Sequence, residues 1–300
     1  MSRKKTIIIS LLLTLIVLTG CSKENQTIRL GSMPTYSAAI YAVGIENGFF
    51  EEAGVTVDLT VFKSSRERDG AATAGELDGF MTDIMGAVNM NVKGFPFIMT
   101  SREWEDFGVM ANAQTDVNAV NPLKIGIAEN TVTEFIADTY IQTDVEKVNI
   151  LAIPDRMGAV LSDVLDSGVF PQPFMGIITG KNGQQIFTTA SEDFHPVVLV
   201  FDESYINENE AAVKAFYEGY KKTVEYMQST DYNEYKSALV SNGLATNETV
   251  DSYRLPVNEY GLNAVDEKAF DAITAWMLEK GLLDTSVSFS DVCTPSYANE

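Results

Sequence analysis

Few residues in this chain could build a catalytic or metal centre. The 300 residues include one histidine, His195, and two cysteines, Cys21 and Cys293. One histidine excludes a multi-histidine metal site, and two cysteines exclude a disulfide-rich scaffold. His195 lies in a polar loop ahead of an expected strand, where a histidine usually faces solvent. We therefore expect no catalytic residue, no metal and no cofactor, and the remaining chemistry is that of ligand recognition.

Residues suited to binding a small molecule follow several of the expected strands. Ligands in α/β proteins collect beyond the carboxyl ends of strands. Arg156 could hold a carboxylate or sulfonate through paired hydrogen bonds, and Asp83, at the donor end of a helix, could contact an amine. Tyr36 and Trp104 could stack on a ring. On these grounds the residues expected at the site are Thr35, Tyr36, Ser65, Arg66, Thr82, Asp83, Trp104 and Arg156.

Several of these residues also have a plain structural role open to them. The hydroxyl-rich loop that contains Tyr36 could cap a helix, as could Asp83 and Ser65, whereas Trp104 could pack locally and Arg66 could face solvent. The sequence does not separate these roles from ligand contact.

The elements that would position these residues alternate along the chain. From Thr27 onward, short β-rich runs alternate with helical patterns, which predicts an α/β fold with mostly parallel sheets flanked by helices. A proline-containing connection at residues 117–122 separates two such series. The last third is helical, with Asn209 and Asp266 placed to cap two helices that would pack on the first series. The predicted domains are residues 27–116 plus 204–300 for lobe 1 and residues 117–203 for lobe 2.

The N-terminus has the pattern of an export signal. Three basic residues precede an apolar run at 7–18, which is shorter than the roughly twenty residues that span a bilayer. The run ends in LTGC at 18–21, which resembles the lipobox of bacterial lipoproteins. The resemblance implies that residues 1–20 are a signal peptide, that Cys21 carries the lipid, and that residues 21–26 are a tether. The alternative is a short membrane anchor with an incidental cysteine.

The charge balance excludes generic nucleic-acid binding. The chain carries 21 basic and 42 acidic side chains, a formal charge of −21, and without its first twenty residues the charge is −24. Phosphate contacts need cations, so the chain as a whole repels nucleic acid. Hydrophobic residues make up 45% of the sequence, which is enough to form a core and excludes disorder. The acidic excess suits a solvated surface and does not name the ligand.

Six segments occur in the order expected of one protein family. They are IRLGSMPT at 28–35, GIENGFFEEAGV at 44–55, AGELDGF at 74–80, KIGI at 124–127, DSGVFPQPF at 166–174 and AAVKAF at 211–216. Together they resemble the substrate-binding lipoproteins of ABC importers in the nitrate/sulfonate/thiamine-precursor group of type II periplasmic binding proteins. The resemblance extends over residues 27–297. It implies two lobes that close on a small molecule in the cleft between them and present it to a membrane permease and its ATPase.

The resemblance adds four residues to the expected site. Asn130 and Thr131 begin a helix where the family presents hydroxyls and amides to the ligand, and Gln172 and Phe174 lie where the family's Pro-Glu-Pro loop lines the cleft. Here that loop reads Pro-Gln-Pro, so one negative charge is missing. This departure puts in doubt a ligand whose cationic group would pair at that position.

The ligand has two candidate classes on this sequence. A heteroaromatic compound such as a thiamine-pyrimidine precursor would use Asp83, Tyr36, Trp104 and Gln172, and we favour it because this set is larger. A sulfonate, nitrate or other small anion would use Arg156 and helix N-termini. An enzyme on the same fold and a sensor lipoprotein are the alternatives of another class. We expect a monomer, held by Cys21 on the extracytoplasmic side of the cell membrane.

Overall fold

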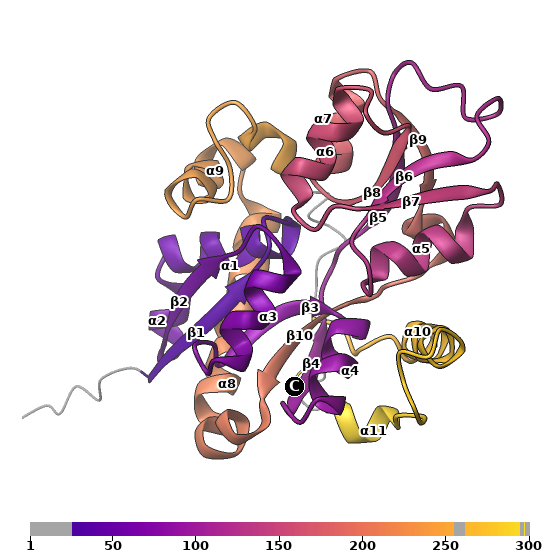
Figure 1. Cartoon of the computed structure of the whole chain (residues 1–300). Helices are drawn as coiled ribbons and strands as arrows, with labels where there is room; N and C mark the ends of the chain where they lie inside the picture. Colours follow the sequence, from indigo (N-terminus) through magenta and orange to yellow (C-terminus); the bar gives the residue numbers. More distant parts are fainter. Residues whose placement is uncertain (1–25, 255–261, 295–296, 298–300) are drawn as a thin grey trace, which may run out of the picture.

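The chain folds around two five-stranded sheets (Figure 1). This computed structural model describes residues 26–254, 262–294 and 297, so the expected signal peptide and the lipidation site at Cys21 lie outside the described residues. Within the described part of the chain, no helix is long and apolar enough to cross a membrane.

The first sheet carries the N-terminal and the last strands. Its order is β2 (Val55–Val61), β1 (Gln26–Ser32), β3 (Gly79–Asp83), β10 (Val197–Asp202) and β4 (Phe97–Arg102). The pairs of β1 with β2 and β3 are parallel, and the pairs of β10 with β3 and β4 are antiparallel. The sheet is therefore mixed, because β10 returns from the second sheet and enters against the direction of its neighbours.

The second sheet has the same plan. Its order is β7 (Val145–Asn149), β6 (Leu123–Ile127), β8 (Ser167–Pro171), β5 (Phe107–Ala111) and β9 (Gln184–Thr188). Strand β6 pairs in parallel with β7 and β8, whereas β5 pairs antiparallel with β8 and β9. The predicted two-lobed α/β fold is confirmed, with mixed sheets in place of mostly parallel ones.

Helices cover these sheets on both sides. In the first lobe they are α1 (Tyr36–Glu46), α2 (Phe49–Ala53), α3 (Ser65–Thr73), α4 (Ile84–Val92), α8 (Glu203–Ser229), α9 (Tyr232–Ser241), α10 (Glu267–Glu279) and α11 (Phe289–Val292), with a 3₁₀ turn at Val250–Tyr253. In the second lobe they are α5 (Val132–Tyr140), α6 (Ile153–Leu161) and α7 (Phe174–Gly180), with a 3₁₀ turn at Thr189–Glu192.

Two hydrophobic clusters hold these layers together. One joins α1, α8 and α9 to the first sheet. Helix α1 packs closely on its neighbours, because a Cβ added to Gly44 would lie 2.5 Å from both the Phe50 ring and Thr223 Oγ1. The other cluster includes α4 and α10 of the first lobe and continues into α5 and the second sheet. The helices of the last third therefore pack on the first lobe, as predicted.

The lobe boundaries differ from those predicted. Strand β5 lies in the second sheet although residues 27–116 were assigned to lobe 1, and β10 lies in the first sheet although residues 117–203 were assigned to lobe 2. Both strands are buried almost throughout, so their composition predicts a core strand without saying which sheet it joins. The chain crosses between lobes at residues 103–106 and 193–196, and the segment at 117–122 lies within the second lobe.

Candidate functional site

A narrow cavity lies between the two lobes. Its volume is about 70 Å³, which is room for on the order of five water molecules. Its polar lining comes from both lobes and from the segment that crosses between them: Thr35, Ser65, Arg68, Thr82, Asp83, Glu105, Thr131, Thr133 and Arg156. Apolar side chains, including Met33, Met81, Phe107 and Ile153, line the rest. A concave apolar pocket with a few convergent polar groups is typical of a small-molecule site.

A wider cavity adjoins the first one. Its volume is about 350 Å³, and five residues line both cavities: Ser65, Arg68, Asp83, Thr131 and Leu151. Arg66 and Asn130 line the wider cavity but not the narrower one, and both residues are exposed. We interpret the wider cavity as the mouth of the narrower one.

Asp83 joins the two lobes across the cavity. It caps α4, where Oδ1 accepts a hydrogen bond from the amide of Gly86 at 2.7 Å. Its Oδ2 lies 3.4 Å from the amide nitrogen of Val132, the first residue of α5 in the other lobe. Burial raises the pKa of Asp83, although the Gly86 amide and Arg68 oppose the rise. Both roles that the sequence left open, helix cap and cleft residue, are therefore filled by one side chain.

Arg68 lies on the first-lobe wall of the cavity. Its side chain is buried and donates to the carbonyl of Met81 at 3.0 Å and to Thr82 Oγ1 at 2.8 Å. It also forms an ion pair with Asp69 at 2.7 Å. The neighbouring Arg66, which was predicted at the site, is exposed. Helix α3 begins at Ser65, so Ser65 and Arg68, three residues apart, lie on the face toward the cavity, and Arg66 lies on another face.

Arg156 is the least compensated cation of the cavity. It is 1% exposed, and its Nε and Nη1 donate to the carbonyls of Val169 at 3.0 Å and Ile150 at 2.7 Å. Among the described residues no carboxylate forms an ion pair with it, and burial lowers its pKa to about 10. A buried guanidinium without an ion-pair partner attracts an anion strongly, because little water is present to screen its charge.

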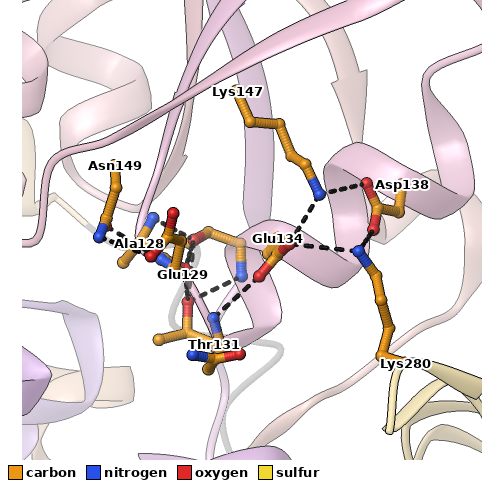
Figure 2. Close-up of polar contacts among 10 residues, drawn as sticks. Ala128, Glu129, Thr131, Glu134, Asp138, Lys147, Asn149 and Lys280 are labelled. Carbon is orange, nitrogen blue, oxygen red and sulfur yellow. Dashed lines mark hydrogen bonds and ion pairs between the residues drawn. The ribbon is translucent and has the colours of Figure 1, made fainter. Parts of the chain in front are cut away.

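The N-terminus of α5 forms the second-lobe wall. Thr131 caps the helix, and its hydroxyl donates to the carbonyl of Ala128 at 2.8 Å, while the amide of Asn130 donates to Glu134 at 2.9 Å (Figure 2). Thr131 and Thr133 both line the narrow cavity. The local pattern of threonine followed three residues later by glutamate explains why the helix begins here.

Two carboxylates on this helix form ion pairs with lysines from both lobes. Lys147 and Lys280 both point toward Glu134 and Asp138 (Figure 2), with distances of 2.6 to 3.3 Å. Burial alone would raise the pKa of Glu134, but the hydrogen bonds from Lys147 and Asn130 outweigh it, so its pKa lies below the usual range. Lys280 follows α10, which packs on α4 of the first lobe, so the two ion pairs of Lys280 join α5 to the first lobe, whereas those of Lys147 lie within the second lobe.

Glu105 was not predicted at the site, yet it lines the cavity. It lies on the crossing segment between β4 and β5 and is 3% exposed. Its Oε1 accepts from the amide of Ser37 at 2.9 Å, and its buried Oε2 has no hydrogen-bond partner among the residues that the structure describes. Burial raises the pKa of Glu105 to about 8. The acidic run EWED at 103–106 was the signal in the sequence that could have indicated it.

Four predicted residues lie away from the two cavities. Tyr36 and Trp104 stack on each other with ring centroids 6.1 Å apart, and Tyr36 is buried in the core of the first lobe. Phe174 is buried in the core of the second lobe, and Gln172 is partly exposed with its backbone bound to Asp106. The structure thus brings Thr35, Ser65, Thr82, Asp83, Thr131 and Arg156 together at the narrow cavity.

Solved structures share this two-lobed fold. The ligand-binding component of an ABC-type import system from Staphylococcus aureus, with zinc bound, has a TM-score of 0.76 at 15% identity, covering 92% of this chain and 99% of that chain. The periplasmic aliphatic sulphonate binding protein SsuA from Escherichia coli has a TM-score of 0.71 at 10% identity, covering 89% and 91%. The desulfurization enzyme DSZB has a TM-score of 0.67 at 12% identity, covering 92% and 98%.

The fold is that of the type II periplasmic binding proteins, as the sequence resemblance predicted. Residues 22–241 match the NMT1-like family, and because this match covers most of the chain, the chain belongs to that family. No curated protein sequence matches the chain.

Proposed function

We propose that this chain is the solute-binding protein of an ABC importer, which captures a small molecule between its lobes and delivers it to a membrane permease. The observation that carries the proposal is the interlobe cavity, whose polar lining comes from both lobes. A ligand bound there would contact Asp83 on one side and Arg156 on the other, so binding favours the closed arrangement. The family and the solved structures of the same fold support this proposal.

The geometry supports an anionic group on the ligand. Of the four residues that favoured a heteroaromatic compound, Asp83 lines the cavity, while Tyr36, Trp104 and Gln172 do not. Arg156, the centre of the anion alternative, lines it without a carboxylate partner among the described residues. The proposed ligand is therefore a small solute with an anionic group at Arg156.

The test is to identify what the protein carries. Purified protein is denatured, and released small molecules are identified by mass spectrometry and then tested with stripped protein in a thermal-shift panel. A ligand that binds the folded state alone raises the melting temperature. The proposal expects sulfonates or other small anions to raise it. If pyrimidines raise it and anions do not, the heteroaromatic alternative is correct.

An enzyme on the same fold is the second candidate, because DSZB has this architecture. His195, the one histidine of the sequence, lies outside the two cavities and contacts Asp193 at 3.0 Å. Incubation of the ligand with purified protein separates the candidates. Recovery of intact ligand supports a carrier, and its loss supports an enzyme.

We also propose that lipid on Cys21 anchors the protein on the extracytoplasmic side of the membrane, as the sequence pattern at 18–21 predicts. Cys21→Ser is expected to move the protein from the membrane fraction to the soluble fraction or to leave it unprocessed. Unchanged lipidation of this variant would contradict the proposal.

A further inference from the structure

Helix α10 of the first lobe contacts α5 of the second lobe outside both cavities. The Trp276 ring meets the Phe135 ring edge to face, with centroids 5.9 Å apart. Lys280, at the end of α10, forms ion pairs with Glu134 at 3.3 Å and with Asp138 at 2.8 Å (Figure 2). None of these five residues lines either cavity. The two lobes are therefore joined by a second set of contacts, separate from those at the ligand site.

Helix α10 is fixed to the first lobe by its apolar face. Its buried residues include Phe270, Ile273 and Met277, and the helix packs on α4, which begins next to Asp83 at the cavity. Helix α5 packs on β6 and β8 of the second sheet. Because each helix belongs to a different lobe, a movement that separates α5 from the first lobe must break the contacts between α5 and α10.

Helix α5 carries one wall of the narrow cavity. Thr131 caps this helix, Thr133 lies in its first turn, and both line the cavity. Glu134 and Asp138 follow Thr131 by three and seven residues, so they continue along one face of the same helix. The ion pairs of α5 with Lys280 therefore act on the helix that positions the threonine wall.

We infer that Lys280 is a positioning residue for ligand binding. It holds α5, and with it the wall formed by Thr131 and Thr133, against the first lobe without contacting the ligand. This inference rests on the proposed carrier function. A contact made in the closed arrangement alone raises affinity, because the ligand binds that arrangement. Lys280 is 36% exposed, so salt screens its contribution, which corresponds to about a two- to fivefold change in Kd.

Lys147 offers a matched control on the same two carboxylates. It forms ion pairs with Glu134 at 2.6 Å and Asp138 at 2.9 Å, but it belongs to β7 of the second lobe and approaches α5 from the other side (Figure 2). Lys147→Gln removes the same charge from the same acids and leaves the contact between the lobes in place. A role in folding alone would give Lys147→Gln and Lys280→Gln the same effect on binding.

The first experiment is calorimetric titration of stripped protein with ethanesulfonate, in low salt and in 1 M NaCl. In low salt, Lys280→Gln is expected to raise Kd about two- to fivefold, whereas Lys147→Gln changes it by less than about 1.5-fold. Lys280→Arg keeps the charge and is expected to bind as wild type does. In 1 M NaCl the difference between wild type and Lys280→Gln should disappear.

The second experiment measures the distance between the lobes without any ligand. Spin labels replace Lys93 and Glu129, which are exposed on opposite lobes and line the wider cavity, in a background with Cys21→Ser and Cys293→Ser. Pulsed electron resonance then gives the distribution of distances between the labels. We expect Lys280→Gln to increase the share of long distances, as 1 M NaCl should in the wild-type background, whereas Lys147→Gln should not.

The outcomes separate this inference from the proposed function. Equal distance distributions for Lys280→Gln and Lys147→Gln overturn the inference, and so does an equal Kd for the two variants. If ethanesulfonate does not bind wild type, the distances decide the inference alone. Longer distances in Lys280→Gln would then support the positioning role, while the missing binding would count against the proposed anionic ligand.

Discussion

Replacing Arg156 should separate ligand affinity from stability. The change is Arg156→Gln, which removes a guanidinium that is 1% exposed and has no carboxylate partner among the described residues. Losing one member of a buried charge pair costs about 2–5 kcal/mol of binding energy. This corresponds to a rise in Kd of roughly 30-fold to 4,000-fold.

The effect of Arg156→Gln on folding should be smaller, because two contributions oppose each other. The carbonyls of Ile150 and Val169 lose their donors, at about 1–3 kcal/mol for each unsatisfied group. Burial lowers the pKa of Arg156 from 12.5 to about 10, so removing the cation relieves a desolvation cost of about 3 kcal/mol. We therefore expect the free energy of unfolding without ligand to change by no more than about 2–3 kcal/mol.

The assay is calorimetric titration of the anionic ligand, with urea denaturation of the same samples. Arg66→Gln is the matched control, since Arg66 is exposed at the wider cavity, and its Kd should change by less than about threefold. Arg156→Lys should lose part of the affinity, because a lysine keeps the charge without the planar fork. Binding by Arg156→Gln within threefold of wild type would refute the assignment of Arg156 as the anion site.

Three further predictions concern the surroundings of the cavity. A Cβ on Gly126 would lie 2.7 Å from Leu165 Cδ1 and 2.9 Å from Cγ of the cavity arginine, so Gly126→Ala should lose about 1–3 kcal/mol of stability, measured by urea denaturation, and weaken binding. Gly158→Ala, which adds a Cβ with nothing within 4 Å, should be neutral or stabilising. Lys280→Ala removes the two ion pairs that α5 makes with the first lobe, and because Lys280 is 36% exposed and screened by solvent, we expect the free energy of unfolding to fall by about 0.5–1 kcal/mol in low salt. In ligand-free protein, the free energy of unfolding should fall as pH rises from 5 to 8, since native Glu103 and Glu105 hold protons that the unfolded chain has released, with a slope of at most about 1.4 kcal/mol per pH unit for each group.

Each of these predictions has a contradicting result. Equal stability of the Gly126 and Gly158 variants would show that β6 can shift away from the arginine. A loss for Lys280→Ala that persists in 1 M salt would show that its contribution is packing and not charge. A free energy of unfolding that stays constant or rises between pH 5 and pH 8 would contradict the raised pKa values of Glu103 and Glu105.

The sequence predicted the two-lobed fold and part of the site. Asp83 and Thr131 begin helices directly after strands, where ligands collect in α/β folds, and both line the cavity. Arg68 was missed because its position on the inward face depends on α3 beginning at Ser65, three residues earlier. Glu105 was missed because it lies on the segment between β4 and β5. This segment crosses between the lobes because β5 joins the second sheet, and the sequence did not predict which sheet β5 joins.

Local sequence explains helix starts better than it explains lobe membership. Asp266 caps α10 as predicted, accepting from the amides of Lys268 and Ala269. Asn209 was predicted to start a helix, and it lies at a kink inside α8 where its non-helical backbone angles separate two helical segments, so the second segment begins directly after it. Caps depend on a few neighbouring residues, whereas the sheet that β5 or β10 joins depends on partners far along the chain.

The central claim is that the protein binds one small solute between its lobes and returns it unchanged. The most direct measurement is titration of stripped protein with the recovered ligand, followed by mass spectrometry of the ligand after release. The account predicts saturable binding of one ligand per chain, loss of binding in Arg156→Gln, and intact ligand. Chemical conversion of the ligand, or binding that Arg156→Gln leaves unchanged, would contradict it.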